Sequence, residues 1–338
     1  MHKAVNIIGI IVLLFIVLWL IFWLFSHKRF AVEYGISFNQ NHASDLGLDW
    51  KKVYTESLNE LRPKHLRVAA MWSDVEPVQG QFDFSNVDFM MDEAEKRGVK
   101  VLLVVGQKAP RWPECHVPGW FSGEGENSKE NLLRYAEEVV KRYKNHPALE
   151  SWQVENEPFI GFKFGACAFY DKTLVYDEIA LLRSLDTFHK VVVTDSGELS
   201  TWRKASKAGD IFGTTVYRIV RTPGGMVFSY DWMPAGFYRL KARFWGRGYE
   251  DFIVSELQAE PWFTDSNPMS TSVEIQEKTM NPDRLRAHID YVERIGANRA
   301  YFWGVEWWYF MKEERADSRY WDMIQELMSP PKVESVGV

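Results

Sequence analysis

Residues 99–106 read Val-Lys-Val-Leu-Leu-Val-Val-Gly, and this short stretch decides the class of fold. From Val101 to Val105 no polar residue interrupts the apolar run, which is typical of a strand covered on both faces. Strands of this kind occur in parallel sheets, where helices pack on the sheet. The stretch therefore predicts an α/β domain.

The pattern of residues 99–106 recurs along the chain. Further strand-like runs lie near residues 31–38, 65–72, 148–155, 190–195, 210–217, 251–256 and 299–304. Helical patterns separate many of them, with apolar residues at i, i+3, i+4 and i+7 from Val87 and Leu132, and at i, i+4 and i+7 from Leu285, where His288 occupies i+3. Gly98 and Gly296 follow two of these helices, where a left-handed residue commonly ends a helix.

Eight strand–helix units in about 300 residues predict a (β/α)8 TIM barrel. A doubly wound open sheet is the alternative fold. It is disfavoured because no glycine-rich phosphate-binding turn follows the first strand.

The N-terminal segment is apolar on every face. No charged residue occurs from Val5 to Phe25, and 21 helical residues at about 1.5 Å each span roughly 30 Å, the thickness of a hydrocarbon core. A cleaved signal peptide is the alternative, but no Ala-x-Ala site follows. We expect a single transmembrane helix through residues 5–25 that stays in place as an anchor.

The expected organisation is an N-terminal anchor (1–29), a catalytic barrel (30–328) and a flexible tail (329–338). The short tail before the span and the two cysteines, Cys115 and Cys167, favour an extracytoplasmic barrel. A disulfide between them and two free thiols are both compatible with the sequence. Because the first strand enters a barrel at its amino-terminal face, we expect that face to lie nearest the membrane.

Composition narrows the function. The chain has 338 residues, with 40 basic and 46 acidic side chains, so its net charge of −6 argues against a nucleic-acid partner. Two cysteines cannot form a four-thiolate zinc site, and the eight histidines lack metal-ligand spacing. We expect no metal and no cofactor.

Candidate chemistry lies at the carboxyl ends of the predicted strands, which form the catalytic mouth of such a barrel. The residues at these ends are Arg67, Gln107, Asn156 with Glu157, Tyr217, Glu256 and Trp303. Two of them, Glu157 and Glu256, are carboxylates on different strands. Cleavage of a glycosidic bond requires one carboxylic acid and one carboxylate in this arrangement.

The stretch Trp152-Gln-Val-Glu-Asn-Glu-Pro158 resembles the fourth-strand signature of the retaining glycoside hydrolases of clan A. The resemblance implies that Glu157 is the acid/base and that Asn156 binds a sugar 2-hydroxyl. Val254-Ser255-Glu256-Leu257-Gln258 is similar to the seventh strand of that clan, which makes Glu256 the nucleophile.

Other parts of the chain extend the resemblance. Tyr217 and Trp303 match the sixth-strand tyrosine and the eighth-strand platform tryptophan of the clan. Arg67 and the residues up to Phe84 are similar to the cellulase and mannanase families, whereas Gln-Val-Glu-Asn-Glu is closer to the β-galactosidase families. The active-site histidines usual in cellulases are missing after the third strand and near the sixth.

The sequence therefore predicts a membrane-anchored retaining β-glycosidase that hydrolyses an oligo- or polysaccharide by double displacement. A transglycosylase and a catalytically inactive carbohydrate-binding barrel are the alternatives. The predicted catalytic residues are Glu157 and Glu256, and the predicted substrate-binding residues are Arg67, Asn156, Tyr217, Trp303, Trp262 and Glu306. Glu155 is equally compatible with sugar binding and with packing in the barrel, and Glu260 is the alternative nucleophile.

Overall fold

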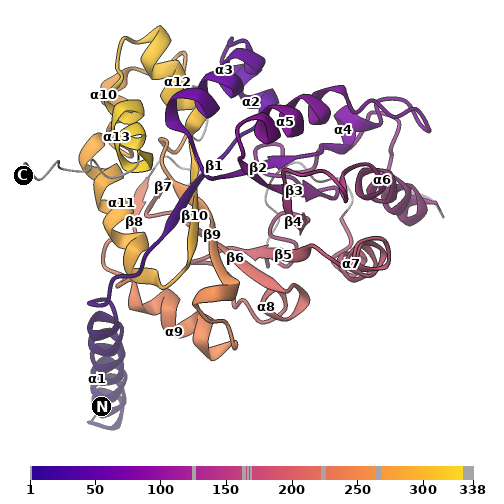
Figure 1. The fold of residues 1–338 in the computed structure, drawn as a ribbon. Helices are drawn as coiled ribbons and strands as arrows, with labels where there is room; N and C mark the ends of the chain where they lie inside the picture. Colours follow the sequence, from indigo (N-terminus) through magenta and orange to yellow (C-terminus); the bar gives the residue numbers. More distant parts are fainter. Residues whose placement is uncertain are drawn as a thin grey trace, which may run out of the picture.

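Eight parallel strands close into a barrel in the order β1-β10-β9-β6-β5-β4-β3-β2, and helices surround it (Figure 1). The structure is a computed structural model and describes residues 2–123, 127–161, 165, 167, 170–221, 226–263 and 268–329. The barrel confirms the predicted TIM fold, and each of its strands overlaps one of the predicted runs.

The barrel strands are β1 (Glu33–Ser37), β2 (His65–Ala69), β3 (Lys100–Val105), β4 (Leu149–Val154), β5 (Lys190–Asp195), β6 (Ile211–Val216), β9 (Phe252–Gln258) and β10 (Arg299–Trp303). A short antiparallel hairpin, β7 (Ile219–Arg221) and β8 (Val227–Ser229), follows β6.

The helices are α1 (His2–Phe25), α2 (Gln40–Asp45), α3 (Trp50–Glu56), the π-helix η1 (Ser57–Leu61), α4 (Trp72–Val75), α5 (Ser85–Lys96), α6 (Ser128–Tyr143), α7 (Leu174–Leu185), α8 (Ala205–Ala208), α9 (Gly236–Phe244), the 3-10 helix η2 (Tyr249–Asp251), α10 (Val273–Gln276), α11 (Pro282–Ile295), α12 (Val305–Glu314) and α13 (Arg319–Met328).

The barrel interior has an apolar layer beneath its polar mouth. Buried Leu102, Val192, Ile253 and Tyr301, from four strands, form one cluster. Gly35 makes room for the tyrosine ring, since a Cβ at this position would lie 2.9 Å from Cδ1 of Tyr301. This apolar floor excludes water below the residues that carry the chemistry.

The helix ends agree with the sequence where glycine marks them. Gly98 follows α5 with φ 67°, and Gly296 ends α11 with φ 88°, both left-handed. The hairpin β7–β8 was not predicted, because its strands of three residues are too short to give a periodic pattern.

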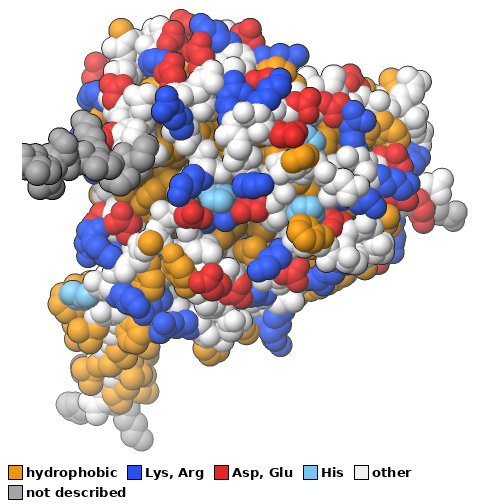
Figure 2. All heavy atoms as spheres, in the orientation of Figure 1, with side chains coloured by type: hydrophobic (Ala, Val, Ile, Leu, Met, Phe, Trp, Pro, Cys, Tyr) orange, Lys and Arg blue, Asp and Glu red, His pale blue; other side chains and the backbone are white. Residues whose placement is uncertain are grey.

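Helix α1 stands out from the barrel as a continuous apolar rod, with Lys and Arg side chains gathered where it leaves the barrel (Figure 2). Its segment Asn6–Phe25 is long and apolar enough to cross a membrane, and it is not buried in the protein. A core helix is thereby excluded, whereas an anchor and a signal sequence both fit these properties.

The C-terminal half of α1 packs against the start of α9. Nε1 of Trp19 donates to the carbonyl oxygen of Trp232 at 2.8 Å, and the backbone N–H of Gly236 donates to Oγ of Ser26 at 2.7 Å. A Cβ at Gly236 would lie 2.1 Å from the carbonyl oxygen of Phe22. Only glycine therefore allows this close approach of the two helices.

Candidate active site

The carboxylate of Glu256, near the end of β9, is held at both oxygens. Nη1 of Arg67 lies 3.0 Å from its Oε1, and the Tyr217 hydroxyl donates to its Oε2 at 2.8 Å. These two hydrogen bonds fix the orientation of the carboxylate between a guanidinium and a phenol.

Arg67 connects three strands of the barrel. Besides Glu256, its guanidinium donates from Nη2 to Oδ1 of Asn156 at 2.8 Å and from Nε to Oε1 of Gln153 at 2.9 Å. Its side chain is fully buried, so these partners replace its hydration. Three predicted residues, Arg67, Asn156 and Glu256, thus form one network at the mouth.

Glu157 approaches the same place from the end of β4. Its backbone has φ 46°, and its N–H donates to Oγ1 of Thr194 at 2.9 Å. Its Oε1 accepts from Oγ1 of Thr215 at 3.1 Å. Thr215 is the direct neighbour of Glu256 in the β6–β9 pair. The two predicted catalytic carboxyl groups therefore come together at the mouth.

The electrostatic surroundings of Glu157 favour its protonated form. Burial raises the pKa of Glu157 well above its ordinary value, and the negative charges of Glu256 and Glu114 raise this pKa further. A protonated carboxyl group beside an ionised one is the arrangement that general-acid catalysis needs.

Glu114 is a third buried carboxyl group at the mouth, which sequence reasoning missed. Its Oε2 accepts from Nδ2 of Asn156 at 3.5 Å, and burial raises its pKa to about 8. It lies in the loop after β3, where no regular pattern marks it. The next residue, Cys115, is bonded to Cys167, with Cα atoms 5.1 Å apart. The disulfide thus joins the loops after β3 and β4.

Glu155 supports the barrel rather than facing an open site. Its two carboxylate oxygens accept from the backbone N–H groups of Gln107 and Lys108, at 2.8 and 2.6 Å. A Cβ at Gly106 would lie 2.6 Å from Cδ of Glu155, so glycine leaves space for this carboxylate. Of the two interpretations of Glu155, the structure favours the one within the barrel.

The predicted aromatic residues have different surroundings. The Trp262 ring meets the Tyr217 ring edge-on, with centroids 5.3 Å apart, and Trp262 stays partly exposed. Trp303 is almost buried, because the guanidinium carbon of Arg111 lies 4.3 Å from its ring centroid. Arg111 therefore covers the predicted sugar platform.

Glu306 does not reach the open mouth as a free carboxylate. It is fully buried, and its oxygens accept from the N–H of Asn39 at 2.6 Å and from Nη2 of Arg111 at 2.8 Å. The structure thus gives this predicted substrate ligand a different role, which is to hold Arg111 over Trp303.

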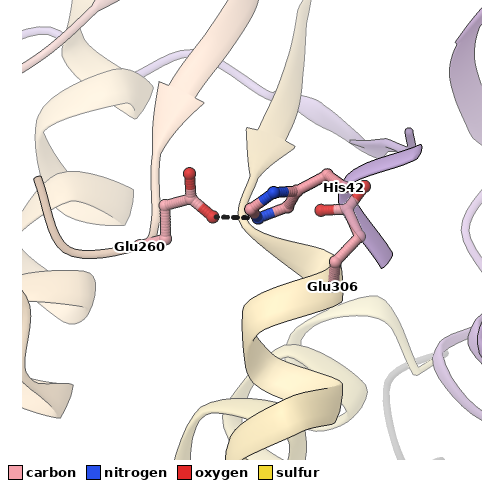
Figure 3. A group of neighbouring side chains, drawn as sticks. All are labelled: His42, Glu260 and Glu306. Atoms are coloured by element: carbon pink, nitrogen blue, oxygen red, sulfur yellow. Dashed lines mark ion pairs between the residues drawn. The ribbon is translucent and has the colours of Figure 1, made fainter. Parts of the chain in front are cut away.

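His42, Glu260 and Glu306 lie close together beside this arginine (Figure 3). Nε2 of His42 is 3.9 Å from Oε2 of Glu260, and one ligand atom from each residue falls within 4.8 Å of the others. Arg111 pairs with both glutamates. Burial, followed by the charge of Arg111, lowers the pKa of His42. The Arg111 guanidinium provides the positive charge that a metal ion would otherwise supply. We therefore interpret this group as an ion-pair cluster in which the Glu260 carboxylate pairs with Arg111.

Comparisons with known proteins bear on the family and the fold. Residues 26–172 match the model of glycosyl hydrolase family 10. A β-galactosidase of Arthrobacter sp. is 35% identical over 104 residues, which cover 25% of this chain and 15% of that protein. A probable mannan endo-1,4-β-mannosidase F of Emericella nidulans is 26% identical over 133 residues, covering 35% and 28%.

Solved structures share the whole barrel. Xylanase 10B of Thermotoga maritima superposes with a TM-score of 0.58 at 15% identity, covering 88% of this chain and 95% of that one. A β-galactosidase of Rahnella sp. R3 gives 0.58 at 14% identity, covering 90% and 56%. The aligned part spans less than a third of the curated relatives quoted above. The chain therefore resembles glycosyl hydrolase family 10 over residues 26–172, and it shares the barrel fold of these solved structures.

Proposed function

We propose that the protein is a retaining β-glycosidase in which Glu256 is the nucleophile and Glu157 is the acid/base. The observation that carries the proposal is the unequal environment of the two carboxyl groups. Glu256 accepts from a guanidinium and a phenol, whereas the Glu157 carboxyl accepts from the neutral hydroxyl of Thr215. These surroundings support an ionised nucleophile beside a protonated acid.

In the first step, an oxygen of Glu256 forms a bond to the anomeric carbon while the bond to the leaving oxygen breaks. Glu157 transfers its proton to that oxygen, so the aglycone leaves as a neutral alcohol. Arg67 donates to Asn156 as well as to Glu256, and this shared partner supports a role for Asn156 in binding the sugar at the reacting centre. In the second step, ionised Glu157 takes a proton from water, which displaces Glu256 and restores both groups.

Membrane anchoring by α1 is part of the proposal. The apolar segment Asn6–Phe25 supports it, since it is exposed rather than packed in the core. The disulfide between Cys115 and Cys167 supports an extracytoplasmic barrel, because disulfides persist in oxidising compartments. The relatives named above suggest β-galactosides, β-mannans or xylans as substrates.

A panel of aryl β-glycosides, covering galactosides, mannobiosides and xylobiosides, tests the reaction. We expect turnover in which NMR detects the β-anomer first, and we expect Glu256→Ala to abolish turnover while its circular dichroism stays native. Initial release of the α-anomer, or appreciable activity of the variant, would overturn the assignment. Disproportionated oligosaccharides would identify a transglycosylase, and tight glycan binding without turnover an inactive barrel.

A further inference from the structure

We propose that the catalytic mouth is turned toward the membrane, and that the site acts on glycans carried by lipids of that membrane. This inference rests on the proposed glycosidase activity and on α1 as an anchor. It concerns a surface that the reaction itself does not use, beside the hairpin β7–β8.

The contacts of α1 set the direction of the anchor. Along α1, Phe15 and Trp19 contact Trp232, and the carbonyl oxygen of Phe25 accepts from Arg239 farther along α9. Helix α9 runs from the mouth side of the barrel toward the start of β9. Followed from Phe25 back to Phe15, α1 therefore runs alongside the barrel toward the mouth.

The chain after α1 agrees with this direction. The N–H of Phe30 donates to the carbonyl oxygen of Glu293 near the end of α11, and its ring stacks on Tyr249, just before β9. These contacts lie at the end of the barrel where the strands begin. The part of α1 before Phe15 thus projects on the mouth side, not the amino-terminal side expected from the sequence.

An exposed apolar patch lies beside α1 on the same side. It consists of Met226, Val227, Phe228 and Trp232, which are 66%, 45%, 42% and 50% exposed. Trp232 contacts the anchor directly through the rings of Trp232 and Phe15, whose centroids are 6.4 Å apart. Apolar groups of this size, continuous with an apolar helix, match the interfacial region of a bilayer.

The level of the patch follows from the helix rise. Trp19 and Phe15 precede Phe25 by six and ten residues, or about 9 and 15 Å along the axis. When the part of α1 before Trp19 lies in the hydrocarbon core, Trp232 lies at the boundary of that core. Tryptophan is enriched at this boundary, and the basic side chains of Arg239 and Lys28 lie farther from the core, on the headgroup side.

The patch is also close to the reacting groups. The hairpin begins two residues after Tyr217, which donates to Glu256, and Phe228 pairs with Val220 across the hairpin. The chain bends at Arg218, so the three residue steps from Tyr217 to Val220 span at most about 10 Å. Oε1 of Gln258, two residues after Glu256, accepts from the N–H of Ile219 and braces the hairpin. A hairpin seated on lipid would hold the mouth near the headgroups.

A glycan on a lipid headgroup is the substrate class that fits this placement. Its sugar can enter the mouth while its lipid stays in the bilayer, and both enzyme and substrate diffuse in one plane. A soluble polysaccharide would gain nothing from the patch.

Depth labelling tests the orientation in the full chain reconstituted into phosphatidylcholine/phosphatidylglycerol vesicles. Because the two native cysteines are bonded to each other, Phe228→Cys supplies one reactive thiol for a fluorescent label. The control is Phe244→Cys, at the opposite end of α9, where the native side chain is 77% exposed. We expect spin-labelled lipid to quench the label at 228 at least threefold more than the label at 244. Equal quenching, or the reverse, would overturn the orientation.

Activity tests the substrate class. The soluble aryl glycoside cleaved fastest is compared with the hexadecyl glycoside of the same sugar in vesicles. We expect Phe228→Ser to lower vesicle-borne turnover at least fivefold and leave soluble turnover within twofold, with Phe244→Ser changing neither. Unchanged vesicle-borne turnover would overturn the inference while leaving the glycosidase assignment intact. Loss of soluble turnover in the wild type would instead remove the proposed function.

Discussion

The ion pair of Arg67 and Glu256 joins opposite parts of the barrel, with 3.0 Å between Nη1 and Oε1 and both side chains closed to solvent. These residues are 189 positions apart in the chain. The pair therefore forms only when β2 and β9 are both in place. It links the stability of the barrel to the geometry of the reaction.

Replacing Arg67 by Met should damage both properties. A buried charge left without its partner costs about 3–5 kcal/mol, so urea unfolding should show a loss of that order. The kcat/KM for an aryl glycoside should fall by at least about a hundredfold, because about 2.7 kcal/mol or more of transition-state stabilisation is lost. The exposed ion-pair variant Arg183→Met serves as control. Normal kcat/KM in Arg67→Met would contradict the role of the pair.

Replacing Glu157 by Gln should make the rate depend on the leaving group. The variant cannot donate a proton, so phenyl glycosides should lose about 10²–10⁴-fold in kcat/KM. Dinitrophenyl glycosides, whose leaving group needs no proton, should retain most of their first-step rate in a burst measurement. Glu256→Gln is the contrast, because both substrate types should fail. Equal losses for both substrates in Glu157→Gln would argue against an acid role.

The buried carboxyl groups predict how stability varies with pH. The pKa of Glu114 is raised to about 8 and that of Glu155 to about 7, chiefly by burial. The folded state therefore holds these protons more tightly than the unfolded chain. Their stabilising contribution is complete below the ordinary carboxyl pKa of roughly 4–4.5 and is lost as pH rises toward 8.

Glu114→Gln should reduce that dependence, since each such group contributes a slope of at most about 1.4 kcal/mol per pH unit. Urea unfolding at pH 5, 6.5 and 8 measures the slope. The exposed Glu130→Gln should leave it unchanged. A slope in Glu114→Gln as steep as in the wild type would show that this carboxyl group does not carry the effect.

Removing the disulfide should destabilise the domain. Cys115 and Cys167 are 52 residues apart, and a loop of that length restricts the unfolded chain by about 4 kcal/mol in the entropic account. The double variant Cys115→Ser/Cys167→Ser should lose about 2–4 kcal/mol in urea. Two rapidly titrating thiols in the native wild type would show that the bridge is not formed.

The sequence predicted the barrel because each strand has its own local signal. An apolar run such as Val101–Val105 predicts a strand from its own residues, without information on the neighbouring strands. A glycine such as Gly98 indicates a helix end because it readily adopts the left-handed backbone conformation found there. The position of Glu157 and Glu256 at the mouth was predictable for a related reason, since the carboxyl ends of the strands meet at one face of a barrel.

Arg111 and Glu114 were not predictable, because both lie in an irregular loop with left-handed backbone, at φ 89° and 74°. Their positions depend on contacts with Glu306 on α12 and Asn156 after β4. Glu306 was expected to bind a sugar because the sequence pattern gives no sign of Arg111. In the structure, Arg111 donates a hydrogen bond to the Glu306 carboxylate. The direction of α1 is determined by the contacts of Trp19 with Trp232 and of Ser26 with Gly236. The hydropathy of the segment does not predict these contacts.

The bare backbone of Gly236 has a mechanical consequence. With no side chain at this position, the carbonyl of Phe22 packs directly against the backbone of α9, and α1 lies in close contact with the barrel. A membrane that holds α1 would therefore also determine the direction in which the catalytic mouth faces. In Gly236→Ala, the added methyl group would clash with the carbonyl of Phe22 and separate α1 from α9. The barrel would then be tethered to α1 only through the chain, with no change in any residue of the candidate active site.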